Sequence, residues 1–155
     1  MEKTKIWDAR KTRLCIDIVR TIRKFSTCCK LKVGALLITE EFNIVSFGYN
    51  GTPKGTFNCH DVKTIEQHYS WDEIHAEVNC MGKASNQEHA TVLLVTNKPC
   101  IACTQSIIAN KDRLKISEVW YLEEFEDTRY ENNQEILFKS VDIKFRKIGD
   151  KNGRD

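Results

Sequence analysis

Along its whole length the sequence alternates helical and strand patterns, and this alternation constrains the fold more than any other feature. Near the start, apolar residues recur at spacings of three, four or seven, which predicts an amphipathic first helix lying on a core. These residues are Trp7, Leu14, Ile18, Ile22 and Phe25, and Cys15 and Val19 widen the same apolar face. Cys15 is therefore expected to be a core residue.

Eight further segments follow in the same alternating manner. In chain order they are strands over 33–38 and 44–47, a helix over 74–81, a strand over 91–96, a helix over 101–110, a strand over 119–122, a helix over 132–140 and a strand over 141–145. The first two strands are joined by a short polar segment and predict a β-hairpin. Strands separated by helices imply parallel neighbours with right-handed crossovers. We therefore expect an α/β fold, namely a three-layer α/β/α domain with a five-stranded mixed sheet.

Length and charge limit the domain organisation and the partners. The chain has 155 residues and no repeat or Pro/Gly-rich linker, so a single domain is expected over 1–155, with 149–155 as a loose tail. A net charge of +2, from 24 basic and 22 acidic residues, gives no electrostatic footprint for a nucleic acid. No apolar run approaches the ~20 residues needed to cross a bilayer. We expect a cytoplasmic protein with small-molecule partners, and neither a nucleic acid nor a membrane as partner.

Two short motifs carry the candidate chemistry. His75-Ala76-Glu77 stands at the start of one predicted helix, and Pro99 precedes a Cys-x-x-Cys pair, Cys100 and Cys103, at the start of another. On a first helical turn two thiols three residues apart share one face, where the helix dipole favours thiolates. With the imidazole they form a ligand set that suits tetrahedral zinc.

Three protein ligands leave one coordination position open, which distinguishes a catalytic zinc site from a structural one. Zinc lowers the pKa of a bound water to about 7, and such chemistry also needs a proton carrier. Glu77 is expected to act as this carrier, because its spacing from His75 does not suit a second ligand. The alternatives are a structural zinc closed by Cys80 or Cys59, and a thioredoxin-like redox pair.

His-x-Glu followed by Pro-Cys-x-x-Cys is the signature of the zinc nucleobase deaminases. Beyond it, the sequence resembles the deoxycytidylate (dCMP) deaminases, particularly the phage-type members. The motifs that carry the resemblance are residues 26–29, 32–35, 48–55, 73–79, 99–103 and 120–125. The resemblance implies a cytidine-deaminase-like fold and a zinc-dependent hydrolase that converts dCMP to dUMP for thymidylate supply. Deamination of dCTP to dUTP remains open.

The resemblance also implies substrate contacts. Val33, Gly34 and Ala35 are expected to form the floor near the base, and Phe125 takes the place of an aromatic residue that covers the base in relatives. An ordinary core role for Phe125 is an equal alternative. Lys30, Lys32 and Lys54 lie beside the expected pocket and are candidates to meet the monophosphate, with Lys32 taken as the substrate-binding residue. Solvated surface lysines are the alternative.

Regulation is implied by the resemblance as well, since family members are commonly hexamers activated by dCTP and inhibited by dTTP, with Mg²⁺ accompanying triphosphates. The effector site is carried over to Gly48, Tyr49, Asn50 and Gly51. An Asn-Gly pair is also a common turn, so a turn without a regulatory role is the alternative.

A second, structural zinc site is implied by the match of Cys28, Cys59, His68 and Glu73 to ligand positions in some phage-type relatives. Two thiolates, an imidazole and a carboxylate would close a tetrahedral shell. The neighbouring Cys29 and His60 are alternative ligands, and the absence of any second ion is the other alternative.

Rival functions remain. A tRNA adenosine deaminase shares the zinc core but normally needs a basic surface, which the near-neutral charge disfavours. Residues 48–53 favour a nucleotide enzyme over a free-nucleoside cytidine deaminase. A single-strand DNA editor would need aromatic and basic residues interleaved along a groove, and the sequence contains no such run. A catalytically silent nucleotide sensor of the same fold has no chemical need for Glu77.

Overall fold

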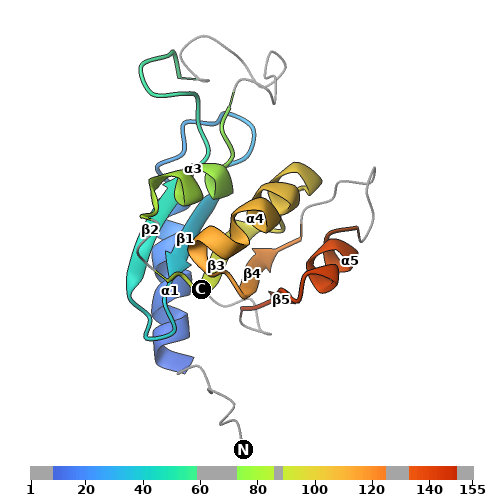
Figure 1. The fold of residues 1–155 in the computed structure, drawn as a ribbon. Coiled ribbons are helices and arrows are strands. Elements are labelled where there is room, and N and C mark those ends of the chain that lie inside the picture. Colours follow the sequence, from blue (N-terminus) through green and yellow to red (C-terminus); the bar gives the residue numbers. More distant parts are fainter. Residues whose placement is uncertain (1–8, 59–72, 86–88, 125–132, 150–155) are drawn as a thin grey trace, which may run out of the picture.

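We describe a computed structural model of the chain that covers residues 9–58, 73–85, 89–124 and 133–149. Its helices and strands follow the predicted order (Figure 1). They are α1 Ala9–Arg23, β1 Gly34–Ile38, β2 Ile44–Tyr49, α3 Ala76–Lys83, β3 Val92–Asn97, α4 Ile101–Leu114, β4 Glu118–Glu123, α5 Asn133–Ser140 and β5 Lys144–Lys147. Apart from Gly149, the predicted tail lies outside the described residues.

The five strands form one mixed sheet in the order β2-β1-β3-β4-β5. β1 pairs antiparallel with both β2 and β3, while β3, β4 and β5 run parallel. Parallel neighbours need a crossover connection, and α4 and α5 supply one each. The expectation of an α/β fold with a five-stranded mixed sheet is confirmed.

Side chains on the two faces of the sheet belong to two apolar clusters, because successive residues of a strand point to opposite faces. Leu37, Leu93 and Val95 join residues of α3, α4 and α5 on one face. Leu36 and Leu94 join residues of α1 on the other. Helices therefore cover both faces, which gives the expected three layers.

The first helix packs most of its predicted apolar face on the sheet, since Ile18 and Ile22 pack against the cluster that contains Cys15 and Val19. Cys15, Ile16 and Val19 are buried, whereas Leu14 is 58% exposed and Phe25, which lies beyond the helix end, is 66% exposed. A Cβ on Gly34 would lie 2.7 Å from the carbonyl oxygen of Val19, so the backbones of α1 and β1 approach more closely than a larger residue permits. This close approach brings α1 directly against β1. Cys15 is a core residue as predicted, and Trp7 lies outside the described residues.

The last strand begins three residues later than the alternation of residues 141–145 suggests. The backbone N–H groups of Val141, Asp142 and Ile143 donate to carbonyl groups at the end of α5, at 3.2, 3.3 and 3.0 Å. Asp142 has a φ of 58°, in the left-handed region. These residues therefore end the helix, and β5 starts at Lys144.

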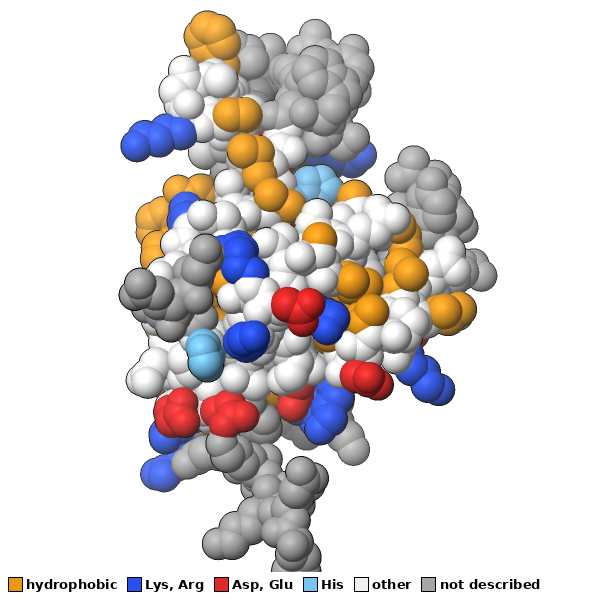
Figure 2. Space-filling view, in the orientation of Figure 1, with side chains coloured by type: hydrophobic (Ala, Val, Ile, Leu, Met, Phe, Trp, Pro, Cys, Tyr) orange, Lys and Arg blue, Asp and Glu red, His pale blue; other side chains and the backbone are white. Residues whose placement is uncertain are grey.

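No described helix is long and apolar enough to cross a membrane. On the face drawn in Figure 2, described basic and acidic side chains are interspersed, and they do not form one basic surface.

Candidate active site

Both motifs lie at helix starts on one edge of the sheet. His75 is the N-cap residue of α3 and Cys100 is the N-cap residue of α4, each with extended backbone. Cys100 follows β3 after a short loop, so the carboxyl end of that strand places it. His75 is placed by a two-bond bridge in which Gly51 and Ile74 exchange N–H···O bonds of 3.2 and 2.8 Å.

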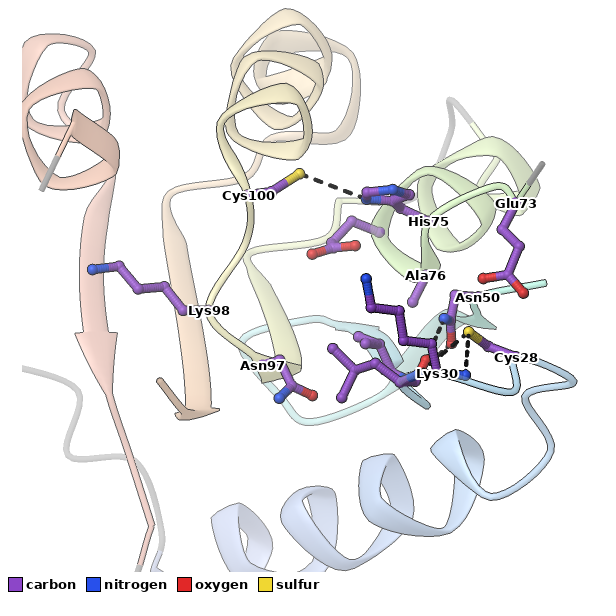
Figure 3. Close-up of a pocket in the computed structure, with 12 residues that line it drawn as sticks. Cys28, Lys30, Asn50, Glu73, His75, Ala76, Asn97, Lys98 and Cys100 are labelled. Carbon is purple, nitrogen blue, oxygen red and sulfur yellow. Dashed lines mark hydrogen bonds between the residues drawn. The ribbon is translucent and has the colours of Figure 1, made fainter. Parts of the chain in front are cut away.

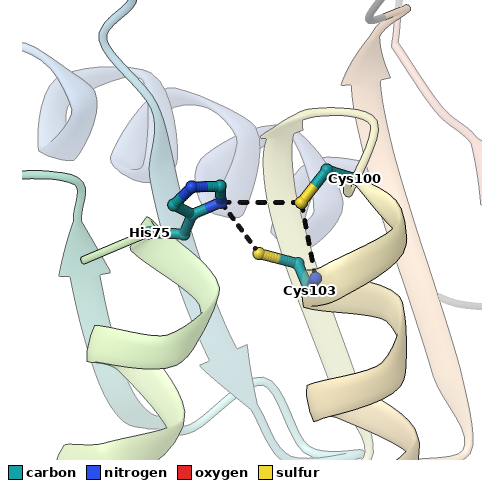
Figure 4. Close-up of side chains that lie close together, drawn as sticks. All are labelled: His75, Cys100 and Cys103. Atoms are coloured by element: carbon teal, nitrogen blue, oxygen red, sulfur yellow. Dashed lines mark hydrogen bonds between the residues drawn. The ribbon is translucent and has the colours of Figure 1, made fainter. Parts of the chain in front are cut away.

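The three candidate ligands converge on one point (Figure 4). Nδ1 of His75 lies 3.1 Å from Sγ of Cys103 and 3.6 Å from Sγ of Cys100, and all three ligand atoms lie within 4.8 Å of one another. Tetrahedral zinc bonds to sulfur and nitrogen place such atoms about 3.5 Å apart. The donor set and its spacing therefore fit a zinc ion with three protein ligands.

The pKa values of the two thiols are shifted in opposite directions. A hydrogen bond from Cys103, supported by His75, lowers the pKa of Cys100 to about 4. The hydrogen bond to Cys100 and burial raise the pKa of Cys103 well above its usual value. Without a cation the pair therefore shares one proton, and a divalent cation would replace it. The hydrogen bond with Cys100 also raises the pKa of His75.

Glu77 lies in the first turn of α3 beside this cluster. It is 4% exposed, and its Oε2 accepts a hydrogen bond of 3.4 Å from Sγ of Cys103. Burial raises the pKa of its carboxyl group. A carboxyl group with a raised pKa, held next to a metal site, has the properties of a proton carrier.

A pocket of about 170 Å³ opens beside Glu77 and His75 (Figure 3). Residues from four segments line it, namely Cys28, Lys30, Leu31 and Val33; Asn50; Glu73, His75, Ala76 and Glu77; and Asn97, Lys98 and Cys100. The candidate metal ligands and the proton carrier therefore face a space large enough for part of a small ligand.

The predicted floor residues are adjacent to this pocket. Val33 lines it, and Gly34 and Ala35 lie buried in β1 next to Val33. The N–H of Gly34 donates to Oγ1 of Thr96 at 3.1 Å, and this hydroxyl donates to Oδ1 of Asn97 at 2.9 Å.

Sequence reasoning missed Asn97 and Lys98 as pocket residues. Asn97 is the last residue of β3 and Lys98 follows it directly, and ligands of open α/β sheets bind at the carboxyl ends of strands. The position of these two residues in the sequence could have indicated their role.

Among the three lysines expected near a phosphate, Lys30 lines the pocket. Lys32 and Lys54 are exposed and are not among the lining residues. Phe125, the predicted cover of the base, lies outside the described residues.

The predicted effector segment, residues 48–51, makes contacts with residues 26–33 on one side and with α3 on the other. The side-chain amide of Asn50 makes three internal hydrogen bonds, accepting from Ser26 and Val33 at 2.7 and 2.8 Å and donating to Leu31 at 2.7 Å. A Cβ on Gly48 would lie 2.5 Å from the backbone nitrogen of Cys80, so β2 packs tightly on α3. These contacts give the turn a structural role.

Tyr49 is the member of this turn with aromatic contacts near the surface. Its ring lies 6.5 Å from that of Phe25 and 5.8 Å from Nζ of Lys83. The effector role of Gly48, Tyr49, Asn50 and Gly51 stays a prediction.

Two of the four residues predicted to hold a structural zinc are neighbours. A hydrogen bond with Glu73 adds to burial in raising the pKa of Cys28 to about 11, and the backbone N–H groups of Lys30 and Leu31 donate to Sγ of Cys28 at 3.4 and 3.3 Å. Cys59 and His68 lie outside the described residues, as does the alternative ligand His60.

Comparison with known sequences also indicates a zinc-binding region, in agreement with the cluster of His75, Cys100 and Cys103. Residues 5–121 match the family model described as the cytidine and deoxycytidylate deaminase zinc-binding region. ComE operon protein 2 of Bacillus subtilis is 33% identical in an alignment of 110 positions, with coverage of 68% of this chain and 55% of that protein. The deoxycytidylate deaminase of Enterobacteria phage T2 is 29% identical over 140 residues, with coverage of 63% of this chain and 73% of that protein.

A solved structure also shares the fold. The dCMP deaminase from the cyanophage S-TIM5, in complex with dCMP and dUMP, superposes with a TM-score of 0.75 at 21% identity, covering 92% of this chain and all of that chain. The family model spans most of the sequence and includes His75, Glu77, Cys100 and Cys103. The chain therefore belongs to the family of cytidine and deoxycytidylate deaminases with a zinc-binding region.

Proposed function

We propose that this protein catalyses the hydrolytic deamination of dCMP to dUMP. The observation that carries the proposal is the convergence of His75, Cys100 and Cys103 next to the buried carboxyl group of Glu77, at the wall of a pocket. The relatives named deoxycytidylate deaminase support the choice of nucleotide.

The chain's own residues divide the work as follows. The two thiols and the imidazole hold zinc, which supplies an activated water molecule when bound. With zinc bound, Glu77 would take the two protons of that water in turn, passing the first to N3 of cytosine and the second to the amino group, which then leaves as ammonia; its raised pKa favours this role. The narrow pocket beside Val33 orients the base and limits entry of other water.

Lys30 is the described lysine best placed for the monophosphate, because it lines the pocket and its backbone is held by the sulfur of Cys28. In Figure 3 the Lys30 side chain extends toward the space between Asn97 and His75. Lys32 on the same loop is the second candidate for the phosphate. Whether dCTP is also a substrate depends on the room beyond these lysines.

The proposal includes three expectations that follow from family membership. They are regulation by dCTP and dTTP, with Mg²⁺, through residues 48–51; assembly into a hexamer; and a second zinc held by Cys28, Cys59, His68 and Glu73. The ring of Tyr49 beside the exposed ring of Phe25 supports the first, and the contact between Cys28 and Glu73 supports the third.

The test is loss of ultraviolet absorbance at the cytosine band with zinc-loaded protein, comparing dCMP, dCTP, deoxycytidine and adenosine. Each substrate is assayed alone and with dCTP or dTTP as effector. Rapid loss with dCMP, enhanced by dCTP and suppressed by dTTP, is expected. Zinc-loaded protein that turns over no cytosine nucleotide would contradict the proposal.

A further inference from the structure

The first turn of α5 contacts the loop that carries Cys100. Nε2 of Gln134, a residue that is only 5% exposed, donates to the carbonyl oxygen of Pro99 at 3.2 Å. Oε1 of Glu135 accepts from Nζ of Lys98 at 2.7 Å. Two successive residues of α5 are thus bonded to the two residues that precede Cys100.

Lys98 is held in place on several sides. Its side chain is 10% exposed. Besides the contact with Glu135, its Nζ lies 3.9 Å from Oε2 of Glu124, the residue that follows β4. The rings of Tyr121 and Phe145 lie 6.0 and 5.9 Å from Nζ. Figure 3 shows Lys98 extending away from Cys100 and His75, so its ammonium group faces α5 and not the metal ligands.

Stability alone does not explain this arrangement. Oε1 of Gln134 and Oε2 of Glu135 are buried and accept no hydrogen bond from the described part of the chain, which costs free energy. The Lys98 side chain is withdrawn from water while the Glu135 side chain is still 43% exposed, and a partly buried ion pair is commonly no more stabilising than well-packed apolar residues in its place. What the polar contacts provide is a fixed geometry for residues 98–99.

We propose that Lys98, together with Gln134 and Glu135, is a positioning device for the metal ligand Cys100. Cys100 has extended backbone as the N-cap residue of α4, and the helix itself fixes Cys103 but not the residues before it. A backbone bond of 2.8 Å from the N–H of Lys98 to Glu123 attaches the loop to β4, and the side-chain contacts attach it to α5. This inference rests on the proposed zinc role of His75, Cys100 and Cys103.

The test measures release of zinc from the loaded enzyme to a colorimetric chelator, together with kcat and KM for dCMP. Release phases are assigned to the catalytic centre when turnover is lost at the same rate. Lys98→Met and Glu135→Gln are expected to release this zinc about tenfold faster, within the range seen when groups supporting a ligand are changed. For Glu135→Gln we expect kcat to fall while KM is retained, because Glu135 is not among the residues that line the pocket beside Glu77.

Two matched variants separate positioning from general stability. Lys98→Arg retains the charge and is expected to restore slow release. Glu118→Gln makes the same carboxylate-to-amide change in an ion pair with Arg146, at the opposite end of β4, and is expected to release zinc within twofold of the wild-type rate. Melting temperatures of the zinc-free proteins show whether Glu135→Gln and Glu118→Gln are equally well folded.

The proposal is overturned if Lys98→Met and Glu135→Gln both release zinc at the wild-type rate while the wild-type protein deaminates dCMP. If Lys98→Met does not fold, Glu135→Gln decides alone. A wild-type protein that holds no zinc at His75, Cys100 and Cys103 would overturn the proposed function together with this inference, so the two failures are distinguishable.

Discussion

Two cysteine clusters border the same pocket and differ in chemistry. Cys100 is at a helix start beside a second thiol and an imidazole, and its pKa is lowered to about 4. Cys28 is buried in a loop beside Glu73, and its pKa is raised to about 11. The first cluster contains three candidate ligands for a cation, whereas the proposed second set has two described members, and the other two, Cys59 and His68, lie outside the described residues. The thiol at the helix start, beside a second thiol and an imidazole, therefore differs in acidity from the thiol buried beside a carboxyl group.

Replacing one thiol in each cluster tests this comparison most severely. Cys100→Ser is expected to lose the catalytic zinc and all measurable turnover, because two ligands cannot hold the ion in an open site. Cys28→Ser is expected to lose only the second zinc and to retain turnover, with a lower melting temperature. Elemental analysis and the dCMP assay measure both. Full loss of turnover in Cys28→Ser at unchanged catalytic zinc would mean that the clusters are not separate.

Glu77→Gln separates metal binding from proton transfer. The amide keeps the shape of the side chain but cannot carry a proton, so kcat is expected to fall by about 10²- to 10⁴-fold. Zinc content and dCMP affinity should remain near the wild-type values, since Glu77 is not assigned as a ligand. Elemental analysis, calorimetric titration with dCMP and the absorbance assay check these three quantities. A variant that deaminates at the normal rate would exclude the proposed proton carrier.

The pKa difference between the clusters predicts selective alkylation of the zinc-free protein. A thiol with a lowered pKa is deprotonated above that value, so Cys100 is a thiolate at pH 6, while Cys28 becomes one only as the pH approaches 11. Iodoacetamide at pH 6 is expected to modify Cys100 about a hundredfold faster than Cys28, and the rate at Cys100 should fall as the pH is lowered through 4. Peptide mass spectrometry measures both sites. Equal rates at pH 6 would contradict the assigned acidities.

Features of this molecule that depend on residues close together in the sequence were predictable, whereas features that depend on contacts between distant residues were not. The order of elements and the grouping of His75, Cys100 and Cys103 followed from local periodicity and motif spacing, which the structure confirms in the sheet and the cluster. Around α1, periodicity predicted the packing of Cys15, Ile18, Val19 and Ile22 but not the exposure of Leu14 and Phe25.

Contacts between distant parts of the chain were also missed. Lys98 and Glu135 are 37 residues apart, and only the crossover from β4 through α5 brings them together. Likewise, the start of β5 depends on how α5 ends, which the alternation of Val141 and Ile143 concealed. Site residues carried by motifs were therefore predictable, while residues that support them through tertiary contacts were not.

The smallest expected effect concerns the phosphate and compares two lysines on the same loop. Lys30 lines the pocket and Lys32 does not, so Lys30→Met should raise KM for dCMP by about tenfold or more, the usual loss for one hydrogen bond to a charged group. Turnover of deoxycytidine should stay unchanged, because this substrate has no phosphate. Lys32→Met is the matched control, and a KM effect as large as that of Lys30→Met would place the phosphate along the outer side of the loop. An equal loss for dCMP and deoxycytidine in Lys30→Met would instead assign Lys30 to the shape of the pocket, since only a phosphate contact can distinguish the two substrates.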